Sequence, residues 1–592
     1  MSLSRSQCWL LLTLLVILAY GNSLENGFLW DDFTLVTNNS HIRNFEFIPI
    51  AFRSDLFHND SPTAIRYYRP LQTVSYMADY ALWGLNPFGY HLTNGLLHLF
   101  CAVLLFLLLE KLTSNRVAAF AVAALFAVHP VLTNAVTYVS GRADSLAFAA
   151  MLAAWCFWLE RRPLAFTAAA FCYIAALCSR ENAFLFPLLI VLHRLLLQRN
   201  DCRRALLDAL PFAMLALAVA LWRLAVLSLH GSAQPIVSLP WSIRAQLPFR
   251  ALATYVGLLV WPAHLQMERQ VVVGGNWLHV LTVAGALAVV GLVVLARQNP
   301  LARFGTCWFA VTLLPMCVGL IPNASVAEHW LYVPCAGLFL AVVSVLRLTR
   351  GAMFLLAGVL LALTARTAVR NREWRDPMTF YARTKGVAPH SAAVRANLGL
   401  EYAAAGRTND ALLELSAAQR IAPDSVHVTK HLAAIHLRQG NLSVAQGKVA
   451  DALRMAPHHP DVLMQAAMIW ERRGDVPKAR LFYLRAMAQT LSVPLRLEYG
   501  QFLLRHRRYK EALGIAEEIC ALEPPNAEGH NLRGVVLAEM GRWKEAEAAF
   551  EVAARLDRHS PHAKQNLARL RALRERRRYG SVGSDDEGAS LR

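Results

Sequence analysis

The chain has 592 residues, of which 56% are hydrophobic, and its mean hydropathy is +0.35. Soluble proteins have a mean hydropathy near or below zero, so the composition excludes an ordinary soluble enzyme and indicates a membrane protein. The formal net charge is +19. Because the basic residues stand in short loops between apolar segments and on repeat surfaces, this charge does not indicate a nucleic-acid partner.

Apolar segments close to the ~20 residues that a helix needs to cross a bilayer recur through the first two-thirds of the chain. Twelve such segments lie at 7–21, 92–110, 117–138, 144–160, 163–178, 183–198, 205–228, 250–265, 277–296, 304–321, 331–347 and 352–369. The first segment follows Arg5, and no clean small-x-small cleavage site comes after it. We therefore expect it to be a retained span and not a signal peptide.

The arginines predict the side of the membrane on which each loop lies, because cytoplasmic loops are enriched in basic residues. Arg5 precedes the first span, and basic loops at 161–162 and 194–204 fall on the same side when the spans are counted. The basic loops further along the chain fall on the cytoplasmic side only if the segment 250–265 does not cross the membrane. This segment ends in a Trp-Pro pair, and we predict that it is re-entrant or interfacial. We therefore predict about eleven spans, a cytoplasmic N-terminus and an outer face that carries the loop 22–72.

A 34-residue period runs through the last third of the chain. Five copies in one register place small residues such as Gly399 where two helices meet, and prolines such as Pro423 after the second helix. This is the signature of tetratricopeptide repeats. We assign 392–577 to the repeats, with an unpaired capping helix at 561–577, and expect a disordered tail at 578–592.

The predicted topology places the repeats outside the cytoplasm, on the same side as the loop 22–72. Repeat arrays of this kind bind a peptide or protein on a concave face, so we expect an acceptor polypeptide there; the alternative is that the array only scaffolds oligomers. Arginine is much more frequent than lysine, which indicates a GC-rich genome. The expected location is a bacterial inner membrane with periplasmic repeats, and the alternative is an endoplasmic reticulum membrane with lumenal repeats.

Polar residues gather at the predicted outer ends of the spans. The first loop carries Asp31 and Asp32, and an acidic pair beside lipid is costly, which indicates a functional role. His91, Asn94 and His98 recur at i, i+3 and i+7, so they share one helical face, which we expect to look into the protein interior. Other charged residues on this side are Arg69, Arg142, Arg180, Glu181, Arg223, Glu328 and His329. Their number on one face predicts a common cavity.

These residue types indicate a chemistry. Guanidinium groups bind phosphate oxygens in a bidentate manner and stay charged near lipid. A carboxylate beside them can accept the proton of an attacking hydroxyl group. Together they describe the transfer of a group from a lipid phosphate to a hydroxyl.

Motifs in a fixed order carry a resemblance to a known family. They are Trp30-Asp31-Asp32, Tyr68-Arg69-Pro70-Leu71, Gly89-Tyr90-His91-Leu92-Thr93-Asn94 with His98, His129-Pro130, Gly141-Arg142-Ala143-Asp144, Arg180-Glu181, Ala327-Glu328-His329-Trp330-Leu331-Tyr332-Val333-Pro334 and Thr367-Ala368-Val369-Arg370-Asn371. In these motifs the chain resembles the transmembrane-and-tetratricopeptide-repeat O-mannosyltransferases and their bacterial relatives, over nearly its whole length. The resemblance implies an all-α fold, with a GT-C-type transmembrane helix bundle at 1–375 followed by the tetratricopeptide-repeat α-solenoid.

The resemblance also implies an activity, that of an inverting glycosyltransferase. Such an enzyme moves a sugar, mannose or another hexose, from a polyprenyl-phosphate donor to Ser or Thr hydroxyls of exported proteins. Asp31 then corresponds to the catalytic base, and Asp32 assists it or binds a divalent metal. The candidate ligands of the donor phosphate and the substrate are Arg69, His91, Arg142, Arg180, Glu181, Glu328 and His329.

The chain departs from the family pattern at three places. Asn134 stands where an acidic residue is common, and Arg180 replaces a usual lysine. Glu328-His329-Trp330 replaces the usual Glu-Arg-Tyr, which removes a permanent positive charge from the expected site.

Two other functions stay open at the level of sequence. The chain could be a non-catalytic membrane scaffold that recruits proteins through its repeats, in which case replacing Asp31 would not matter for function. It could also transport a lipid-linked sugar, but a transporter needs a polar path to the cytoplasmic side, and the polar clusters gather on one face only.

Overall fold

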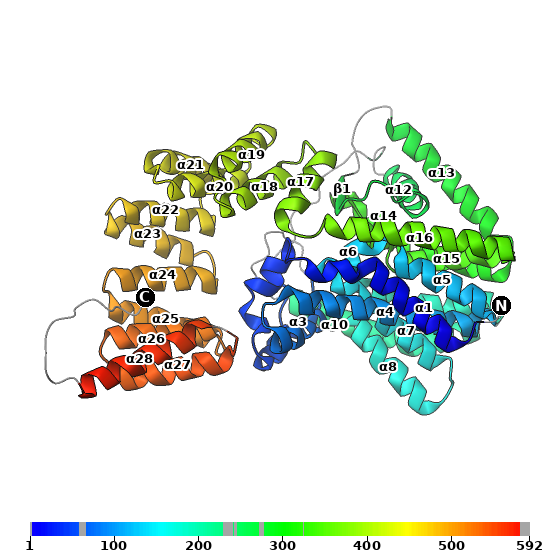
Figure 1. Cartoon of the computed structure of the whole chain (residues 1–592), viewed down its shortest axis with the longest axis horizontal. Coiled ribbons are helices and arrows are strands. Elements are labelled where there is room, and N and C mark those ends of the chain that lie inside the picture. The colour runs from blue at the N-terminus through cyan, green and yellow to red at the C-terminus, as the bar shows by residue number, and fades with distance from the viewer. Residues whose placement is uncertain are drawn as a thin grey trace. The chain divides into compact units, whose positions relative to one another are not determined.

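The computed structural model describes residues 3–57, 67–199, 201–228, 241, 245–270, 277–323, 325–559 and 561–579. The chain forms two compact units (Figure 1). The membrane unit comprises Met1–Asn38 and Ile48–Phe380, and the repeat unit comprises Asn39–Phe47 and Tyr381–Arg592. The described elements are almost entirely helical, which confirms the predicted all-α class.

The membrane unit is a helix bundle in which every predicted apolar segment coincides with a helix for most of its length. Its helices are α1 Arg5–Tyr20, α2 Ile48–Ala51, α3 Pro70–Trp83, α4 Pro87–Thr113, α5 Arg116–Val128, α6 Thr133–Val136, α7 Arg142–Trp158, α8 Pro163–Leu177, α9 Phe186–Leu196, α10 Cys202–Ser228, α12 Leu247–Val260, α13 Trp277–Ala296, α14 Pro300–Asn323, α15 Pro334–Val345 and α16 Arg350–Arg372. Two short antiparallel strands, β1 Glu268–Gln270 and β2 Ser325–Ala327, pair with Arg269 opposite Val326.

Several of these helices are long enough to span a bilayer. Among the described residues, five helices pass on length and apolar character, or six if the bent pair Arg116–Val128 and Pro130–Val136 is one span. The two members of that pair meet at 51°, at the His129-Pro130 break. The chain is therefore a multi-pass membrane protein. The count of about eleven spans stays a prediction, because other helices, such as α9 and α15, are shorter.

The segment 250–265 forms only a short helix. α12 has 14 residues, which gives a length of about 21 Å at ~1.5 Å per residue. The hydrocarbon core of a bilayer is ~30 Å thick. The side chain of Arg366 donates hydrogen bonds to the carbonyls of Pro262 (3.2 Å) and Ala263 (2.9 Å), directly after the helix. This helix is short for a full span, as α9 and α15 also are, so the re-entrant or interfacial placement of 250–265 stays a prediction.

Helix α3 was not expected from the sequence, because the segment after the loop 22–72 is too polar to be found as a span. Pro70 occupies the first helical position, which suits its fixed φ and missing N–H. Asp79 and Tyr80 are buried, whereas Leu82 and Trp83 are exposed. The helix is therefore amphipathic and packs one polar face inward.

The loop after α1 and the end of α16 are joined directly. The side-chain amide of Asn22 donates to Ala368 O (2.7 Å), and that of Asn26 donates to Asn371 O (3.1 Å). The backbone N–H of Gly27 donates to Arg375 O (2.8 Å). The two ends therefore lie on the same side of the membrane, which requires an odd number of crossings from the start of α1 to the end of α16.

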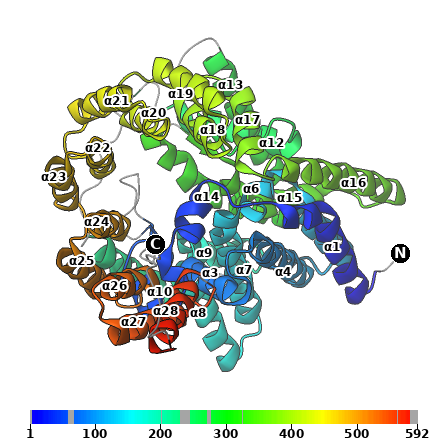
Figure 2. The same ribbon diagram turned by 60° about the vertical axis from the view of Figure 1, so that its left-hand side comes forward.

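The repeat unit is a curved stack of antiparallel helix pairs (Figures 1 and 2). It contains α17 Pro377–Val387, α18 Ala392–Ala404, α19 Thr408–Ile421, α20 Val426–Arg438, α21 Leu442–Met455, α22 Pro460–Arg472, α23 Val476–Met487, α24 Val493–Arg505, α25 Tyr509–Leu522, α26 Ala527–Glu539, α27 Trp543–Leu556 and α28 Pro561–Tyr579, with α17 crossing the boundary between the units. The five predicted repeats are the pairs from α18 to α27, and α28 is the capping helix. Most of the predicted tail, 580–592, lies outside the described residues.

A left-handed turn residue joins the two helices of each repeat. In four repeats it is a glycine, at Gly406, Gly440, Gly474 and Gly541, with φ between 76° and 81°. The fourth repeat uses Arg507, with φ of 57°. This left-handed conformation is less favourable for a residue with a Cβ than for glycine. The backbone of the turn therefore explains why glycine recurs at this position of the repeat.

We expect the loop after α1 and the end of α16 to react with a membrane-impermeant maleimide from the same, extracytoplasmic side. Glu25 and Arg375 are exposed, so Glu25→Cys and Arg375→Cys each place a thiol at the surface. In a Cys520→Ser background, intact cells should label both variants. The exposed native Cys202, in a loop predicted to be cytoplasmic, is the control and should react only after permeabilisation. Labelling of Cys202 and Arg375→Cys from the same side would contradict the topology.

Candidate functional site

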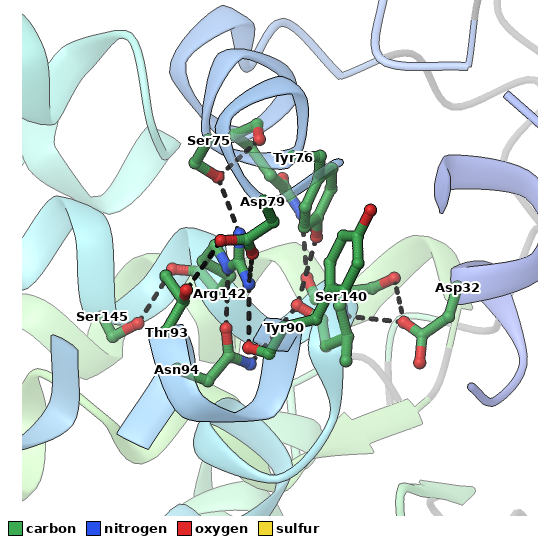
Figure 3. Close-up of polar contacts among 12 residues, drawn as sticks. Asp32, Ser75, Tyr76, Asp79, Tyr90, Thr93, Asn94, Ser140, Arg142 and Ser145 are labelled. Carbon is green, nitrogen blue, oxygen red and sulfur yellow. Dashed lines mark hydrogen bonds and ion pairs between the residues drawn. The ribbon is translucent and has the colours of Figure 1, made fainter. Parts of the chain in front are cut away.

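Asp32 anchors the turn at Leu29–Asp32, which follows the first helix and which we call the acidic turn. Its side chain is 1% exposed. One carboxylate oxygen accepts the N–H of Leu29 (2.9 Å), and the other accepts the N–H of Ser140 (2.8 Å) and the Ser140 hydroxyl (Figure 3). Burial raises the pKa of Asp32 to about 7, against the opposing effect of these hydrogen bonds. Asp32 is therefore placed to fix the turn and not to face a substrate.

Asp31 is the more accessible carboxylate of the pair. It is half-buried, and its backbone N–H donates to the hydroxyl of Tyr138 (3.0 Å). The residue before it, Trp30, has φ of 49°, a left-handed conformation that is uncommon outside glycine. Strain of this kind persists only where the surroundings hold it, and it is concentrated at functional sites. The backbone at Trp30 and Asp31 is thus held in one conformation.

Three arginines and two carboxylates form a second cluster, which we call the arginine cluster. Arg69 binds Glu181 through both Nη2 (2.8 Å) and Nε (3.4 Å), and Arg223 Nη2 lies 3.0 Å from the same carboxylate. Arg180 Nη1 lies 2.7 Å from Asp144 Oδ2. The side chains of Arg69, Arg180 and Arg223 are 11%, 9% and 19% exposed. The cluster is therefore largely desolvated but reaches the surface.

The charges within the arginine cluster are coupled. Burial disfavours the charged form of Glu181, but Arg69 and Arg223 outweigh it and hold the pKa of Glu181 at about 2. Burial, and then Arg180 and Arg69, lower the pKa of His329 well below its usual value. Its ring is therefore neutral at physiological pH. The predicted residues Arg69, Arg180, Glu181 and His329 are thus brought together by the fold.

Ser140 connects the acidic turn to the start of α3. Its N–H and hydroxyl bind Asp32, and its carbonyl accepts the side-chain amide of Gln72 (2.9 Å). Gln72 lies in the first turn of α3, three positions after Arg69. Hydrogen bonds and one helical turn thus lead from the acidic turn to the arginine cluster.

Arg142 does not join this cluster, which corrects its assignment as a phosphate ligand. Its side chain is completely buried. Nε donates to Asn94 Oδ1 (2.6 Å), Nη1 to Ser75 Oγ (3.2 Å) and Nη2 to Tyr90 O (2.9 Å), and Nη2 lies 2.5 Å from Asp79 Oδ2 (Figure 3). Because all three nitrogens bind protein groups, Arg142 is placed to hold α3, α4 and α7 together.

The histidine face of α4 points inward, as the spacing predicts. His91, Asn94 and His98 are all buried. His98 contacts the hydroxyl of Tyr332 (2.8 Å) and the carbonyl of Ala127 (3.1 Å). His91 lies under the first loop, near the backbone of Asn26. None of these contacts brings His91 to the arginine cluster, so its position favours a role in packing the loop.

Glu328 does not join the arginine cluster, although His329, the next residue in the chain, lies near it. It is 1% exposed, one of its oxygens accepts the N–H of Gln266, and the other is 3.8 Å from Arg370 Nη2. Burial raises the pKa of Glu328 to about 7. The side chain thus ties the segment after α12 to α16, and it does not enter the arginine cluster.

The described residues contain no group of three or more His, Cys, Asp and Glu side chains that could hold a metal ion. Both oxygens of Asp32 already accept hydrogen bonds. The assignment of Asp31 and Asp32 as metal ligands stays a prediction.

The sequence alone did not reveal the supporting residues Ser140, Gln72 and Asp79. Asp79 carried a usable signal, because an acidic residue on the buried face of an aromatic-rich helix needs a partner. Ser140 and Gln72 carried none, since their importance comes from contacts that span 108 and 68 positions.

The family model for the tetratricopeptide repeat matches residues 432–490 and 496–561. The chain is 24% identical to the protein O-mannosyl-transferase F38B6.6 of Caenorhabditis elegans over 68% of this chain and 61% of that protein. It is 38% identical to the protein O-mannosyl-transferase TMTC1 of Mus musculus over 22% of this chain and 14% of that protein.

The chain is related to the protein O-mannosyl-transferases. This confirms the resemblance to the O-mannosyltransferases that the ordered motifs indicate, and the resemblance to bacterial relatives stays a prediction. The matched region spans less than two thirds of the length of either relative. Among solved structures, a thermophilic TPR protein of Thermus thermophilus is 20% identical, covers 31% of this chain and 100% of its own, and has a TM-score of 0.28.

Replacing Ser140 with Ala should loosen the acidic turn. The change removes one of three hydrogen bonds to a buried carboxylate, at a cost of about 1–3 kcal/mol. We expect a lower midpoint of thermal unfolding in detergent and faster amide exchange at Leu29–Asp32. Ser145→Ala is the matched control, because Ser145 is also buried but its hydroxyl donates to Arg142 O, within its own helix (3.0 Å). Equal effects of the two changes would contradict the anchoring role of Ser140.

Proposed function

We propose that the chain is a GT-C-type inverting glycosyltransferase that moves a sugar from a polyprenyl-phosphate donor to Ser or Thr hydroxyls of a polypeptide. The observation that carries this proposal is the connection through Ser140 between the acidic turn, which presents Asp31, and the arginine cluster. A base and a set of guanidinium groups held by one framework suit the deprotonation of a hydroxyl and the departure of a phosphate. The names of the related proteins support protein O-mannosylation as the activity.

The proposed reaction has a simple balance. Asp31 takes the proton of the acceptor hydroxyl, and the hydroxyl oxygen attacks the anomeric carbon of the sugar. The bond between that carbon and the phosphate oxygen breaks, and the polyprenyl phosphate leaves with the bonding pair. Attack from the face opposite the leaving group inverts the anomeric centre. Stabilisation of the phosphate charge by Arg69, Arg180 and Arg223 should matter more than its protonation.

The charge of the arginine cluster suits an anionic donor. The cluster contains three guanidinium groups and two carboxylates, those of Glu181 and Asp144, so its net charge is +1. A phosphodiester brings one negative charge to this surface. Glu181 holds Arg69 and Arg223 in place before the donor arrives, which reduces the ordering needed on binding. The neutral ring of His329 adds a hydrogen-bonding group beside Arg180 and Arg69 without adding charge.

The repeats are proposed to bind the acceptor polypeptide, since arrays of this type present an extended concave surface. The contacts between the loop after α1 and the end of α16 support an acidic turn and repeats that face the same compartment. An exported polypeptide would meet both there. The same arrangement suits a periplasm or an endoplasmic reticulum lumen.

Replacing Asp31 with Asn should abolish the base while keeping the shape of the turn. We expect sugar transfer to an acceptor peptide to fall by at least ~10²-fold, the scale of general-base loss, with donor binding and thermal unfolding unchanged. Intact-mass analysis of the acceptor measures the transfer.

The control for this experiment is Glu25→Gln, which removes an exposed carboxylate from the same loop. It should leave transfer within about twofold of the native chain. Near-native transfer by Asp31→Asn would refute the assignment of the base and would favour a non-catalytic scaffold.

Replacing Arg69 with Ala should weaken donor binding. We expect KM for the polyprenyl-phosphate sugar to rise roughly 10- to 100-fold, the effect of a lost hydrogen bond of ~1.5–3 kcal/mol between charged groups. KM for the acceptor peptide should change little. Arg194→Ala is the control, because Arg194 is also buried and ion-paired, to Asp208 (2.5 Å), but lies in the segment predicted to be cytoplasmic. A similar KM shift in both variants would contradict a direct role of Arg69.

A further inference from the structure

One piece of the first outer loop belongs structurally to the repeats. Asn39–Phe47 clusters with the repeat unit, although the residues on both sides of it in the sequence belong to the membrane unit. The chain thus leaves the membrane unit after Asn38 and returns to it at Ile48. Such an excursion places a nine-residue peptide, from 39 to 47, on a repeat array of a type that binds peptides.

The contact point on the repeats is Glu523, which follows the last residue of α25. Its carboxylate accepts the hydroxyl of Ser40 (3.3 Å) and lies 3.5 Å from Nε2 of His41. Asn526 donates to the same carboxylate (2.8 Å) and also caps α26, by accepting the N–H of Gly529 (2.7 Å). Asn526 of the repeat therefore fixes the Glu523 carboxylate at the α25–α26 junction, where it contacts the peptide.

The peptide has a compact and partly buried conformation. The side chain of Asn39 accepts the N–H of His41 (2.9 Å), and the rings of His41 and Phe47 meet edge to face with centroids 4.7 Å apart. Ile42 and Phe47 are fully buried. Burial lowers the pKa of His41 to about 4. The ring is thus neutral at physiological pH, so its proximity to Glu523 is not an ion pair.

We propose that the α25–α26 junction is a peptide-binding site whose occupant is the chain's own segment 39–47, and that the repeats thereby hold the loop that carries Asp31. The second part of this statement rests on the proposed function. Asn39 follows Asp31 by eight positions, with one short helical turn at Phe33–Thr37 between them. A change in the α25–α26 junction is therefore transmitted through a short and partly ordered connector to the acidic turn.

The test is amide hydrogen exchange, read by mass spectrometry, on the full chain in lipid nanodiscs. Glu523→Lys should raise the exchange rate of 39–47 by about 5- to 30-fold, the effect of one or two kcal/mol in a local equilibrium. Exchange in α18–α23 should not change. Glu517→Lys is the matched control, because Glu517 is exposed on the same helix and undergoes the same change in charge. It should leave the exchange of 39–47 at the native rate.

A second variant approaches the contact from the loop. Ser40→Asp places a carboxylate against Glu523 and leaves the repeats untouched, so it should raise the exchange of 39–47 even if Glu523→Lys disturbs α25 and α26. Glu523→Gln, which keeps an acceptor oxygen, should have a smaller effect than Glu523→Lys. The proposal is overturned if Ser40→Asp leaves 39–47 at the native rate, or if Glu517→Lys and Glu523→Lys release it equally.

The readout separates this proposal from the catalytic one. Asp31→Asn should leave the exchange of 39–47 unchanged, since the anchoring of the peptide does not depend on the base. Transfer to an acceptor peptide should fall in Ser40→Asp with KM for the donor unchanged, because the arginine cluster is not altered. Release of 39–47 with unchanged transfer would refute the positioning of Asp31 by the repeats and leave both the binding site and the catalytic assignment standing.

Discussion

The carboxylate of Asp32 is the group on which the proposed site depends. It is almost fully buried, and it survives there because three donors from Leu29 and Ser140 satisfy it. These bonds close the turn on one side and fasten it to the segment before α7 on the other. A left-handed residue at Trp30 is tolerable under such restraint. Without the restraint, Asp31 would be one mobile carboxylate in a long polar loop.

The arginines illustrate how one residue type serves two purposes in the same part of the molecule. Arg142 uses all three nitrogens on α3 and α4 and is closed to any ligand. Arg69 and Arg223 share one carboxylate, that of Glu181, and both side chains remain partly exposed. The difference lies in the partners: Asp79 and Asn94 surround one guanidinium group, while Glu181 faces two. The replacement of a usual arginine by His329 is then understandable, because the cluster already carries a positive balance.

Local patterns in the sequence were sufficient for the helices and for the repeats. Apolar segments near the length of a bilayer core predict the spans, and the 34-residue period predicts each helix pair, since both depend on neighbours within one or two turns. The inward face formed by His91, Asn94 and His98 was predictable for the same reason. Helix α3 was not predicted, because its buried face carries Asp79, whose partner Arg142 lies 63 positions away in the sequence.

The pairing of distant polar groups could not be predicted in this way. The separation of Arg142 from the arginine cluster, and of Glu328 from His329, is decided by how helices pack and not by the motifs that contain them. Likewise, nothing in the composition of 39–47 distinguishes it from the rest of a polar loop. Its affiliation with the repeats depends on Glu523, which is 483 positions from Ser40.

The contacts between the first loop and α16 also bear on biogenesis. Asn26 and Asn371 are 345 positions apart, so the acidic turn receives its last neighbours only when the final membrane helix has emerged from the ribosome and been inserted. Contacts of such high sequence separation form late, because the intervening chain must first be ordered. A truncated or stalled chain would therefore carry the motif residues without the surface that holds them.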